Sequence, residues 1–390
     1  MRLFMPHRKA GRNLQCQVHI AYKSIKKITI IPFAPPKSSP RAVIPARLRH
    51  PSGAGRSIAP LLSIYLDLVR FLAAIVVVLF HTWQEFYPAS RIRWPGHEAV
   101  VVFFVLSGYV IAHSTSRPGV KFADYLKHRI ARIVPVAWVA LFLGLSISVA
   151  KGEFPITPTL VNLFFLGQSG MWAVEAPNNP AFWSLNYEVW YYLIFAAWVF
   201  SPHKHRIVFT AIATLIAGPK ALLLFPIWLM GVWLYNNTPR FSQSTALMLL
   251  LWSLAAAGAL YWFNISDFLR DRLYQAFPPA WRFHYSSQFI YDFLLGIIVS
   301  IHFAAVASLD QKTGHLARIE KPIRYLAGFT LSIYLFHSPL NVLNRPGISA
   351  LQFYTELAVC IFLLAQLTER RIKFFRKLLD RKRPVHVTSA

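Results

Sequence analysis

An arginine and a histidine lie eleven residues apart on one apolar segment, LDLVRFLAAIVVVLFH, as Arg70 and His81. At about 100° per residue, eleven helical steps make roughly three full turns, so both side chains share one face. Asp67, three residues before Arg70, lies on the same face. Ionisable groups are costly on a membrane-length helix, so we expect them to face a polar interior and to take part in chemistry there.

His81 is a candidate general base, because a neutral imidazole can take a proton from a hydroxyl near neutral pH. Asp67 could neutralise Arg70 one helical turn away. The alternative is that His81 is an interfacial residue beside Trp83 and that Asp67 and Arg70 form a structural ion pair. The face shared with Arg70 favours the catalytic interpretation of His81.

A carboxylate, Glu188, lies in a second apolar segment, FWSLNYEVWYY. Ser184 and Tyr192 are four residues to either side of it, on the same helical face. A carboxylate surrounded by Ser, Tyr and Trp is typical of a site that binds sugar hydroxyls, and it could equally orient an imidazole. The alternative, a hydrogen-bonded structural carboxylate, is less favoured at this depth in a span.

Two arginines, Arg129 and Arg132, share one face of the amphipathic stretch KFADYLKHRIARIVP. Two guanidinium groups so placed could bind phosphates. The alternative is ordinary positive charge on the cytoplasmic side, attracted to anionic lipid.

Two further features are weaker when taken alone. Ser107 and Gly108, in VVFFVLSGYVIAHS, favour close packing of one helix against another. His337, in LSIYLFHSPL, lies near the end of an apolar segment and is a secondary candidate.

The composition places the chain in a membrane. It has 390 residues, of which 55% are hydrophobic and 14% charged, and its mean hydropathy is +0.43. These values exclude an ordinary soluble protein. The net charge of +26 does not indicate nucleic-acid binding, because the basic residues cluster between apolar segments and at both ends. Cys16 and Cys360 are too isolated to predict a disulfide or a metal-thiolate site, and we expect no metal.

The sequence divides into three parts. Residues 1–57 are basic and rich in Pro and Ser, which predicts a disordered extension or a start codon assigned too far upstream. Residues 58–370 form the predicted transmembrane domain, and residues 371–390 a basic cytoplasmic tail.

The predicted fold is all-α, a polytopic integral membrane protein with about ten transmembrane helices. The predicted spans are residues 61–81, 97–114, 133–150, 182–200, 207–218, 220–235, 244–263, 286–308, 324–340 and 350–367.

The distribution of Lys and Arg sets the predicted orientation. These residues are concentrated after the second, fourth, sixth and eighth spans and in the C-terminal run, which predicts both termini in the cytoplasm. The longest outer segments are 151–181 and 264–285, and the first could fold back as a lid or re-entrant element.

Together these motifs resemble the membrane-bound acyltransferase-3 family, which includes O-antigen and peptidoglycan O-acetyltransferases, nodulation-factor acetylases and macrolide acyltransferases. The resemblance covers residues 61–370 and is carried by five motifs in order. One departure is Tyr109, where the family has Phe. The matching residues are Arg70 and His81 with Asp67 and Ala73; Phe103, Phe104, Ser107, Gly108 and Tyr109; Arg129, Arg132, Ile133 and Pro135; Trp183, Ser184, Leu185 and Glu188; and Tyr334 to His337.

The resemblance implies an O-acyltransferase of the cytoplasmic (inner) membrane, which transfers an acyl group, acetyl by default, from acyl-CoA to a carbohydrate or glycoconjugate hydroxyl. We expect His81 to be the general base, Glu188 to position His81 or the hydroxyl, and Arg70 with Asp67 to act on the thioester. The remaining expected site residues are Arg129 and Arg132 for the donor, and Ser107, Tyr109, Trp183 and Ser184 for substrate.

The alternative function is a transporter or flippase for a glycoconjugate or acyl compound, in which the intramembrane charges form a substrate or proton path. The sequence leaves open the acyl group, the acceptor, the oligomeric state, and whether the acyl group first rests on His81.

Overall fold

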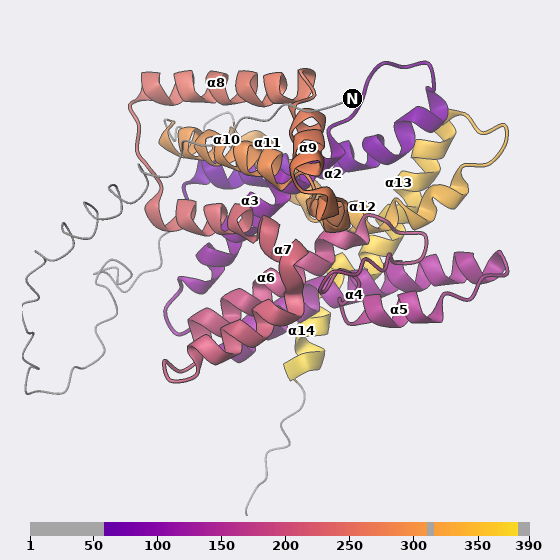
Figure 1. The fold of residues 1–390 in the computed structure, drawn as a ribbon, viewed down its shortest axis with the longest axis horizontal. Coiled ribbons are helices and arrows are strands. Elements are labelled where there is room, and N and C mark those ends of the chain that lie inside the picture. Colours follow the sequence, from indigo (N-terminus) through magenta and orange to yellow (C-terminus); the bar gives the residue numbers. More distant parts are fainter. Residues whose placement is uncertain (1–57, 310–315, 381–390) are drawn as a thin grey trace, which may run out of the picture. The chain divides into compact units, whose positions relative to one another are not determined.

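The computed structural model describes residues 58–309 and 316–380, so the predicted extension 1–57 and the end of the tail, 381–390, lie outside the described residues. Regular structure in the described part is helical, which confirms the all-α prediction (Figure 1). The α-helices are α2 (Pro60–Phe86), α3 (Gly96–Thr115), α4 (Phe122–Ala150), α5 (Ile156–Leu163), α6 (Phe182–Phe200), α7 (Arg206–Asn237), α8 (Gln243–Trp262), α9 (Ile265–Ala276), α10 (Phe289–Ser308), α11 (Leu316–Ala327), α12 (Thr330–Phe336), α13 (Ala350–Leu367) and α14 (Ile372–Asp380). Short 3₁₀ helices are η3 (Pro278–Ser286), η4 (Pro339–Leu343) and η5 (Glu369–Arg371).

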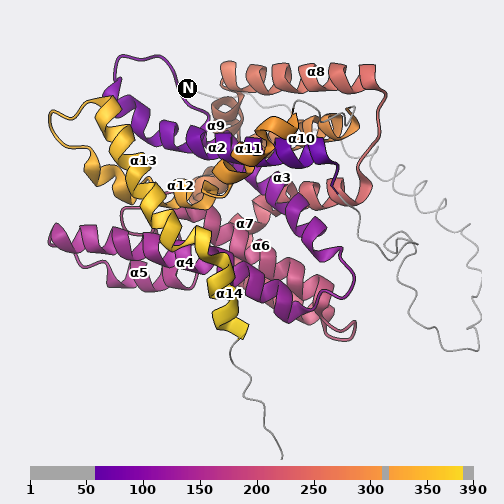
Figure 2. The same ribbon diagram turned by 180° about the vertical axis from the view of Figure 1, so that it is seen from behind.

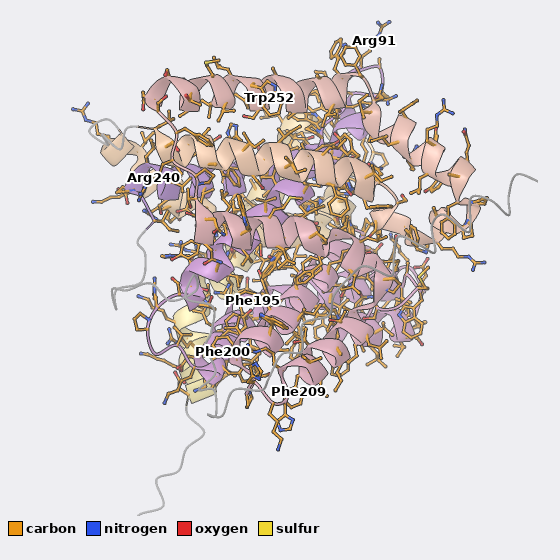
Figure 3. The ribbon with its side chains drawn as sticks, turned by 60° about the vertical axis from the view of Figure 1, so that its left-hand side comes forward. Arg91, Phe195, Phe200, Phe209, Arg240 and Trp252 are labelled. Atoms are coloured by element: carbon orange, nitrogen blue, oxygen red, sulfur yellow. The ribbon has the colours of Figure 1, made fainter. Side chains whose placement is uncertain are left out.

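Membrane-length helices dominate this arrangement. In lipid the backbone must satisfy its own hydrogen bonds, and a long apolar helix does so. Large apolar side chains such as Phe209 and Trp252 lie on the outside of the bundle, where lipid would contact them (Figure 3). Among the described residues, seven segments are long and apolar enough to cross a membrane: Pro60–Phe86, Gly96–Thr115, Phe122–Ala150, Arg206–Asn237, Gln243–Trp262, Arg282–Ser308 and Ala350–Asp380. The count of ten spans and the orientation of the termini stay predictions.

The predicted spans 207–218 and 220–235 lie in one helix, α7, which bends at Gly218. Gly218 has φ 81° and ψ 170°, a backbone conformation that residues other than glycine rarely adopt. A Cβ atom there would also lie only 2.3 Å from the backbone nitrogen of Gly170. The bend therefore allows the segment around Gly170, between α5 and α6, to pack against α7.

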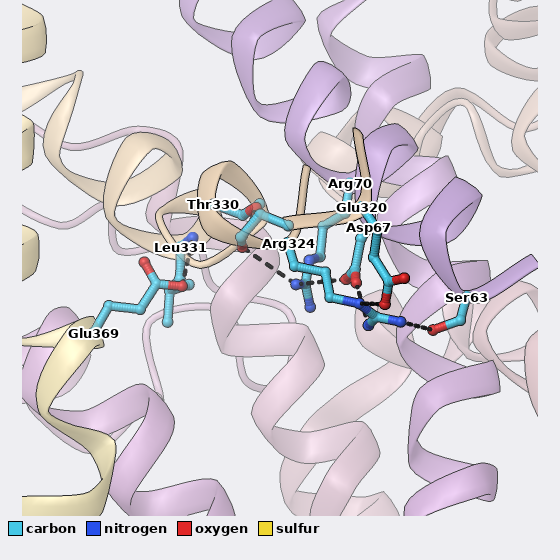
Figure 4. Close-up of polar contacts among 9 residues, drawn as sticks. Ser63, Asp67, Arg70, Glu320, Arg324, Thr330, Leu331 and Glu369 are labelled. Carbon is cyan, nitrogen blue, oxygen red and sulfur yellow. Dashed lines mark hydrogen bonds and ion pairs between the residues drawn. The ribbon is translucent and has the colours of Figure 1, made fainter. Parts of the chain in front are cut away.

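The predicted span 324–340 is wrong as a continuous helix. The chain breaks after α11, forms the seven-residue α12, and continues into η4. The side chain of Glu369 accepts hydrogen bonds from the backbone N–H groups of Leu331 and Ser332, at 3.3 and 2.9 Å (Figure 4). These N–H groups at the start of α12 would otherwise have no helical partner. The short helix α12 packs between α2 and α4 (Figures 1 and 2).

The predicted packing role of Gly108 is confirmed. A Cβ atom on Gly108 would lie 1.9 Å from the carbonyl oxygen of Trp228, and one on Gly231 would lie 1.9 Å from that of Val105. The backbones of α3 and α7 therefore touch at a small-residue contact, as is common between membrane helices. This contact fixes α3 as one wall of the site described next.

Candidate active site

Arg70 is anchored by an ion-pair network in the N-terminal half of α2 (Figure 4). Its Nη2 donates to Oδ1 of Asp67 at 3.0 Å and to the carbonyl oxygen of Ala327 at 3.2 Å. The other oxygen of Asp67 lies 3.2 Å from Nη1 of Arg324, which is also paired with Glu320. The predicted Asp67–Arg70 pair is thus confirmed, and Arg324 is an additional partner that the sequence analysis did not identify.

The Arg70 side chain lines a cavity, here named the arginine cavity, that is enclosed by α2, α3, α4, α6 and α12. Three arginines and one carboxylate line it, from the three helices α2, α4 and α6. The Nε atoms of Arg70 and Arg129 are buried and have no hydrogen-bond partner in the described part of the chain. Its polar and ionisable lining residues are Arg70, Ser107, Arg129, Arg132, Ser184, Glu188, Tyr192, Thr330 and Tyr334.

Glu188 lies in the arginine cavity, where its carboxylate accepts a hydrogen bond from the hydroxyl of Tyr192. The Tyr192 hydroxyl also lies 2.9 Å from Oγ of Ser107, which accepts a hydrogen bond from the indole of Trp228. The guanidinium of Arg129 lies 5.7 Å from the centre of the Tyr192 ring. The structure therefore places Glu188 with the arginines, whereas we expected it to reach His81 or the acceptor.

Two expected substrate-binding residues do not line this cavity. Trp183 is 7% exposed and stacks on Tyr285 with ring centres 4.6 Å apart. Tyr109 is 4% exposed and contacts the edge of Tyr235. Ser107 and Ser184, the other two, do line it.

His81 lies in a different polar cavity, here named the histidine cavity, together with His337. Nδ1 of His81 is 2.9 Å from the carbonyl oxygen of Val77 and 3.1 Å from Nε2 of His337. Because a carbonyl only accepts, Nδ1 carries the proton, which leaves Nε2 of a neutral His81 as the basic nitrogen. Nδ1 of His337 similarly faces the carbonyl of Ile333, so its Nε2 is an acceptor.

The two cavities share no lining residue within the described part of the chain, but α12 connects them. The segment from Ala327 to His337 contacts Arg70 at one end and His81 at the other. Between these ends, Tyr334 lines the arginine cavity, and its ring lies 6.4 Å from that of His337. The Tyr334 hydroxyl is held by Ser184 Oγ at 2.6 Å. Tyr334 therefore stands between the arginines and the histidine pair.

A family model described as an acyltransferase domain matches residues 63–367, which is most of the chain. The chain belongs to this acyltransferase family. This membership confirms the resemblance found in the sequence, and it favours acyl transfer over the transporter alternative.

A curated relative extends the comparison. Over 136 residues the chain is 31% identical to the Exopolysaccharide production protein ExoZ of Rhizobium meliloti (strain 1021). The match covers 32% of this chain and 41% of the relative, so it spans well under half of either protein. No solved structure matches the chain.

The sequence analysis did not identify two buried ionisable groups of the chain as site candidates. Asp292 is fully buried with Oδ1 2.8 Å from Nε2 of His97. Lys220 is also fully buried and donates to Gln168 Oε1 at 3.1 Å and to a backbone carbonyl. Asp292 lies within the predicted span 286–308, so the rule that singled out Glu188 applied to it as well, whereas Lys220 is the first residue of the predicted span 220–235.

Proposed function

We propose that this acyltransferase moves an acyl group, acetyl in the simplest case, from acyl-CoA to a hydroxyl of a carbohydrate or glycoconjugate. Family membership supports the acyl transfer, and the name of the exopolysaccharide-production relative supports a carbohydrate acceptor. The observation that carries the proposal is the arrangement of His81: its Nδ1 contacts a backbone carbonyl, which leaves Nε2 as the basic nitrogen, and α12 connects the polar cavity that it lines to one lined by three arginines.

The arginine cavity is the proposed donor site. Arg129 and Arg132 would bind the phosphates of coenzyme A, since guanidinium groups match phosphate oxygens in geometry and charge. Glu188 and Tyr192 would hold Arg129 in place, and Arg70 would polarise the thioester carbonyl. This assignment puts the donor on the cytoplasmic side of the inner membrane, in line with the predicted orientation.

The histidine cavity is the proposed acceptor site. Nε2 of His81 would take the proton from the acceptor hydroxyl while the hydroxyl oxygen attacks the thioester carbon. The protonated His81 would then give this proton to the departing sulfur, so that coenzyme A leaves as the thiol. The same nitrogen could instead carry the acyl group first, and both routes need His81. In either route the acyl end of the donor must pass Tyr334.

Acceptor-dependent release of coenzyme A thiol tests the proposal on the purified protein in lipid nanodiscs. Thiol should appear with acetyl-CoA and glycan together, and His81→Ala should abolish it while the protein still folds. His203→Ala, which changes an exposed histidine between α6 and α7, is the matched control and should retain full activity. A protein that releases no thiol under any acceptor condition, or a fully active His81→Ala variant, would contradict this function.

A further inference from the structure

The histidine cavity has an unusual set of polar walls. Besides the two histidines, its lining includes three asparagine side chains, Asn178, Asn341 and Asn344, and one lysine, Lys151. No carboxylate lines it among the described residues. Primary amides and a cation, in a lining whose described residues include no acid, suit a ligand that offers hydroxyl groups and a negative charge.

Asn341, which lines the histidine cavity, has a side-chain oxygen without a hydrogen-bond partner among the described residues. Its Nδ2 donates to Oε1 of Glu85 at 2.9 Å, and Asn344 donates to the other oxygen of Glu85 at 2.6 Å. This contact fixes the Asn341 amide, because the reversed orientation would set its oxygen against a carboxylate. Its Oδ1 is buried and has no partner among the described residues. Such a group costs free energy unless a ligand donor, such as a sugar hydroxyl, satisfies it.

Glu85 also ties this amide to the proposed base. It lies four residues after His81 on α2, one helical turn further along the same face. The clamp formed by Glu85, Asn341 and Asn344 therefore holds η4 and the segment that follows it against the end of α2 that carries His81. A hydroxyl bound at Asn341 would belong to the molecule whose other hydroxyl reaches the imidazole.

Lys151 supplies the cation. It follows α4, and its Nζ lies 3.4 Å from Oδ1 of Asn178. Asn178 has φ 50°, and its Nδ2 donates to the carbonyl of Gly144 and to Oγ of Ser148, both at 2.9 Å. These bonds hold the Asn178 side chain against α4, and Asn178 in turn positions the Lys151 ammonium group at the cavity wall. The ammonium group is a compact point charge with three donors, and a single carboxylate is an anion that it can bind.

We propose that the histidine cavity selects an acidic glycan as acceptor, with Asn341 accepting a hydrogen bond from a sugar hydroxyl and Lys151 binding the carboxylate of a uronic acid. This inference rests on the proposed function and adds to it the substrate class and two specificity-determining residues.

The test compares one oligosaccharide of glucose and glucuronic acid with the same oligosaccharide after its carboxyl groups are reduced to alcohols. Thiol release from acetyl-CoA is measured in nanodiscs for both. The wild-type protein should have a kcat/KM about tenfold higher for the acidic form, the effect of one partly exposed charge-assisted hydrogen bond. Lys151→Glu should remove this preference by raising the KM for the acidic form. Asn341→Leu should raise the acceptor KM for both forms, and it should leave the KM for acetyl-CoA unchanged.

Two controls match these changes in chemistry. Arg91→Glu reverses a charge on an exposed residue outside the cavity, and Asn237→Leu removes an amide that bonds only its own helix (Figure 3 labels Arg91). Both should keep the wild-type acceptor preference. Equal use of the two oligosaccharides by the wild type, or an unchanged preference in Lys151→Glu, would overturn the inference and leave the proposed function standing. Absence of thiol release with every acceptor would instead overturn both.

Discussion

Nδ1 of His81 lies 3.1 Å from Nε2 of His337, although 256 residues separate the two in sequence. The contact exists because α12 lies along α2, with Ala327 at Arg70 and His337 at His81. The arginine and the histidine that share one face of α2 therefore both contact the same short segment. Glu369, which accepts hydrogen bonds from the first turn of α12, supports that segment from the far side.

We predict that His337 positions His81 through this contact. When His81 takes a proton, Nε2 of His337 can accept the hydrogen bond from its Nδ1 and so hold the ring. His337→Leu should lower kcat by about tenfold to a hundredfold with little change in the KM for the acceptor. His337→Gln should recover most of the loss, because its amide oxygen can also accept. Steady-state kinetics measure kcat for both variants. Equal losses of kcat in His337→Leu and His337→Gln would mean that His337 contributes packing alone.

Asp67 should matter more for stability than Arg324 does. It accepts hydrogen bonds from both Arg70 and Arg324, so Asp67→Asn leaves two guanidinium groups without their carboxylate. We expect a loss of about 1–3 kcal/mol in the free energy of unfolding. Arg324→Ala should cost less, since Arg324 is 44% exposed and exposed pairs contribute little. Thermal unfolding of the purified variants measures both, and the reverse order would contradict the network as described.

Arg129 should determine donor affinity. Arg129 is 8% exposed and lines the arginine cavity, and its guanidinium lies over the ring of Tyr192. Arg129→Ala should raise the KM for acetyl-CoA at least about tenfold, as expected on losing a charge-assisted phosphate contact. Arg129→Lys should not restore it, because an ammonium group lacks the planar fork with which a guanidinium stacks on a ring and binds two phosphate oxygens in parallel. Arg117→Ala, an exposed basic residue between α3 and α4, is the control. If Arg129→Ala and Arg117→Ala had the same KM for acetyl-CoA, Arg129 would not be part of the donor site.

Helical periodicity was enough to predict which residues on one helix lie together. Arg70 pairs with Asp67, and Glu188 with Tyr192, at spacings of three and four residues. It could not predict which helix faces which cavity. Glu188 was therefore expected near His81, and the structure places it with Arg129.

The broken segment 324–340 escaped prediction for a different reason. Its hydropathy suits a span, and the break depends on Glu369, a carboxylate from a distant segment that supplies hydrogen-bond acceptors to the backbone of α12. A contact between residues 37 and 38 positions apart leaves no periodic signal in the sequence. For the same reason His337 was only a secondary candidate, since its proximity to His81 depends on that break.

The contact between α3 and α7 gives the last prediction. Gly108→Ala would place a Cβ atom 1.9 Å from the carbonyl oxygen of Trp228, so the two helices would have to separate. Separation would also break the hydrogen bond from the Trp228 indole to Ser107, one wall of the arginine cavity. We expect a lower melting temperature, less monodisperse protein and a raised KM for acetyl-CoA. Gly258→Ala on α8 is the matched control, because its Cβ would meet nothing within 4 Å and alanine favours a helix by about 1 kcal/mol. If the two variants behaved alike in size-exclusion profile and donor KM, the close approach of α3 and α7 would not be what shapes the donor site.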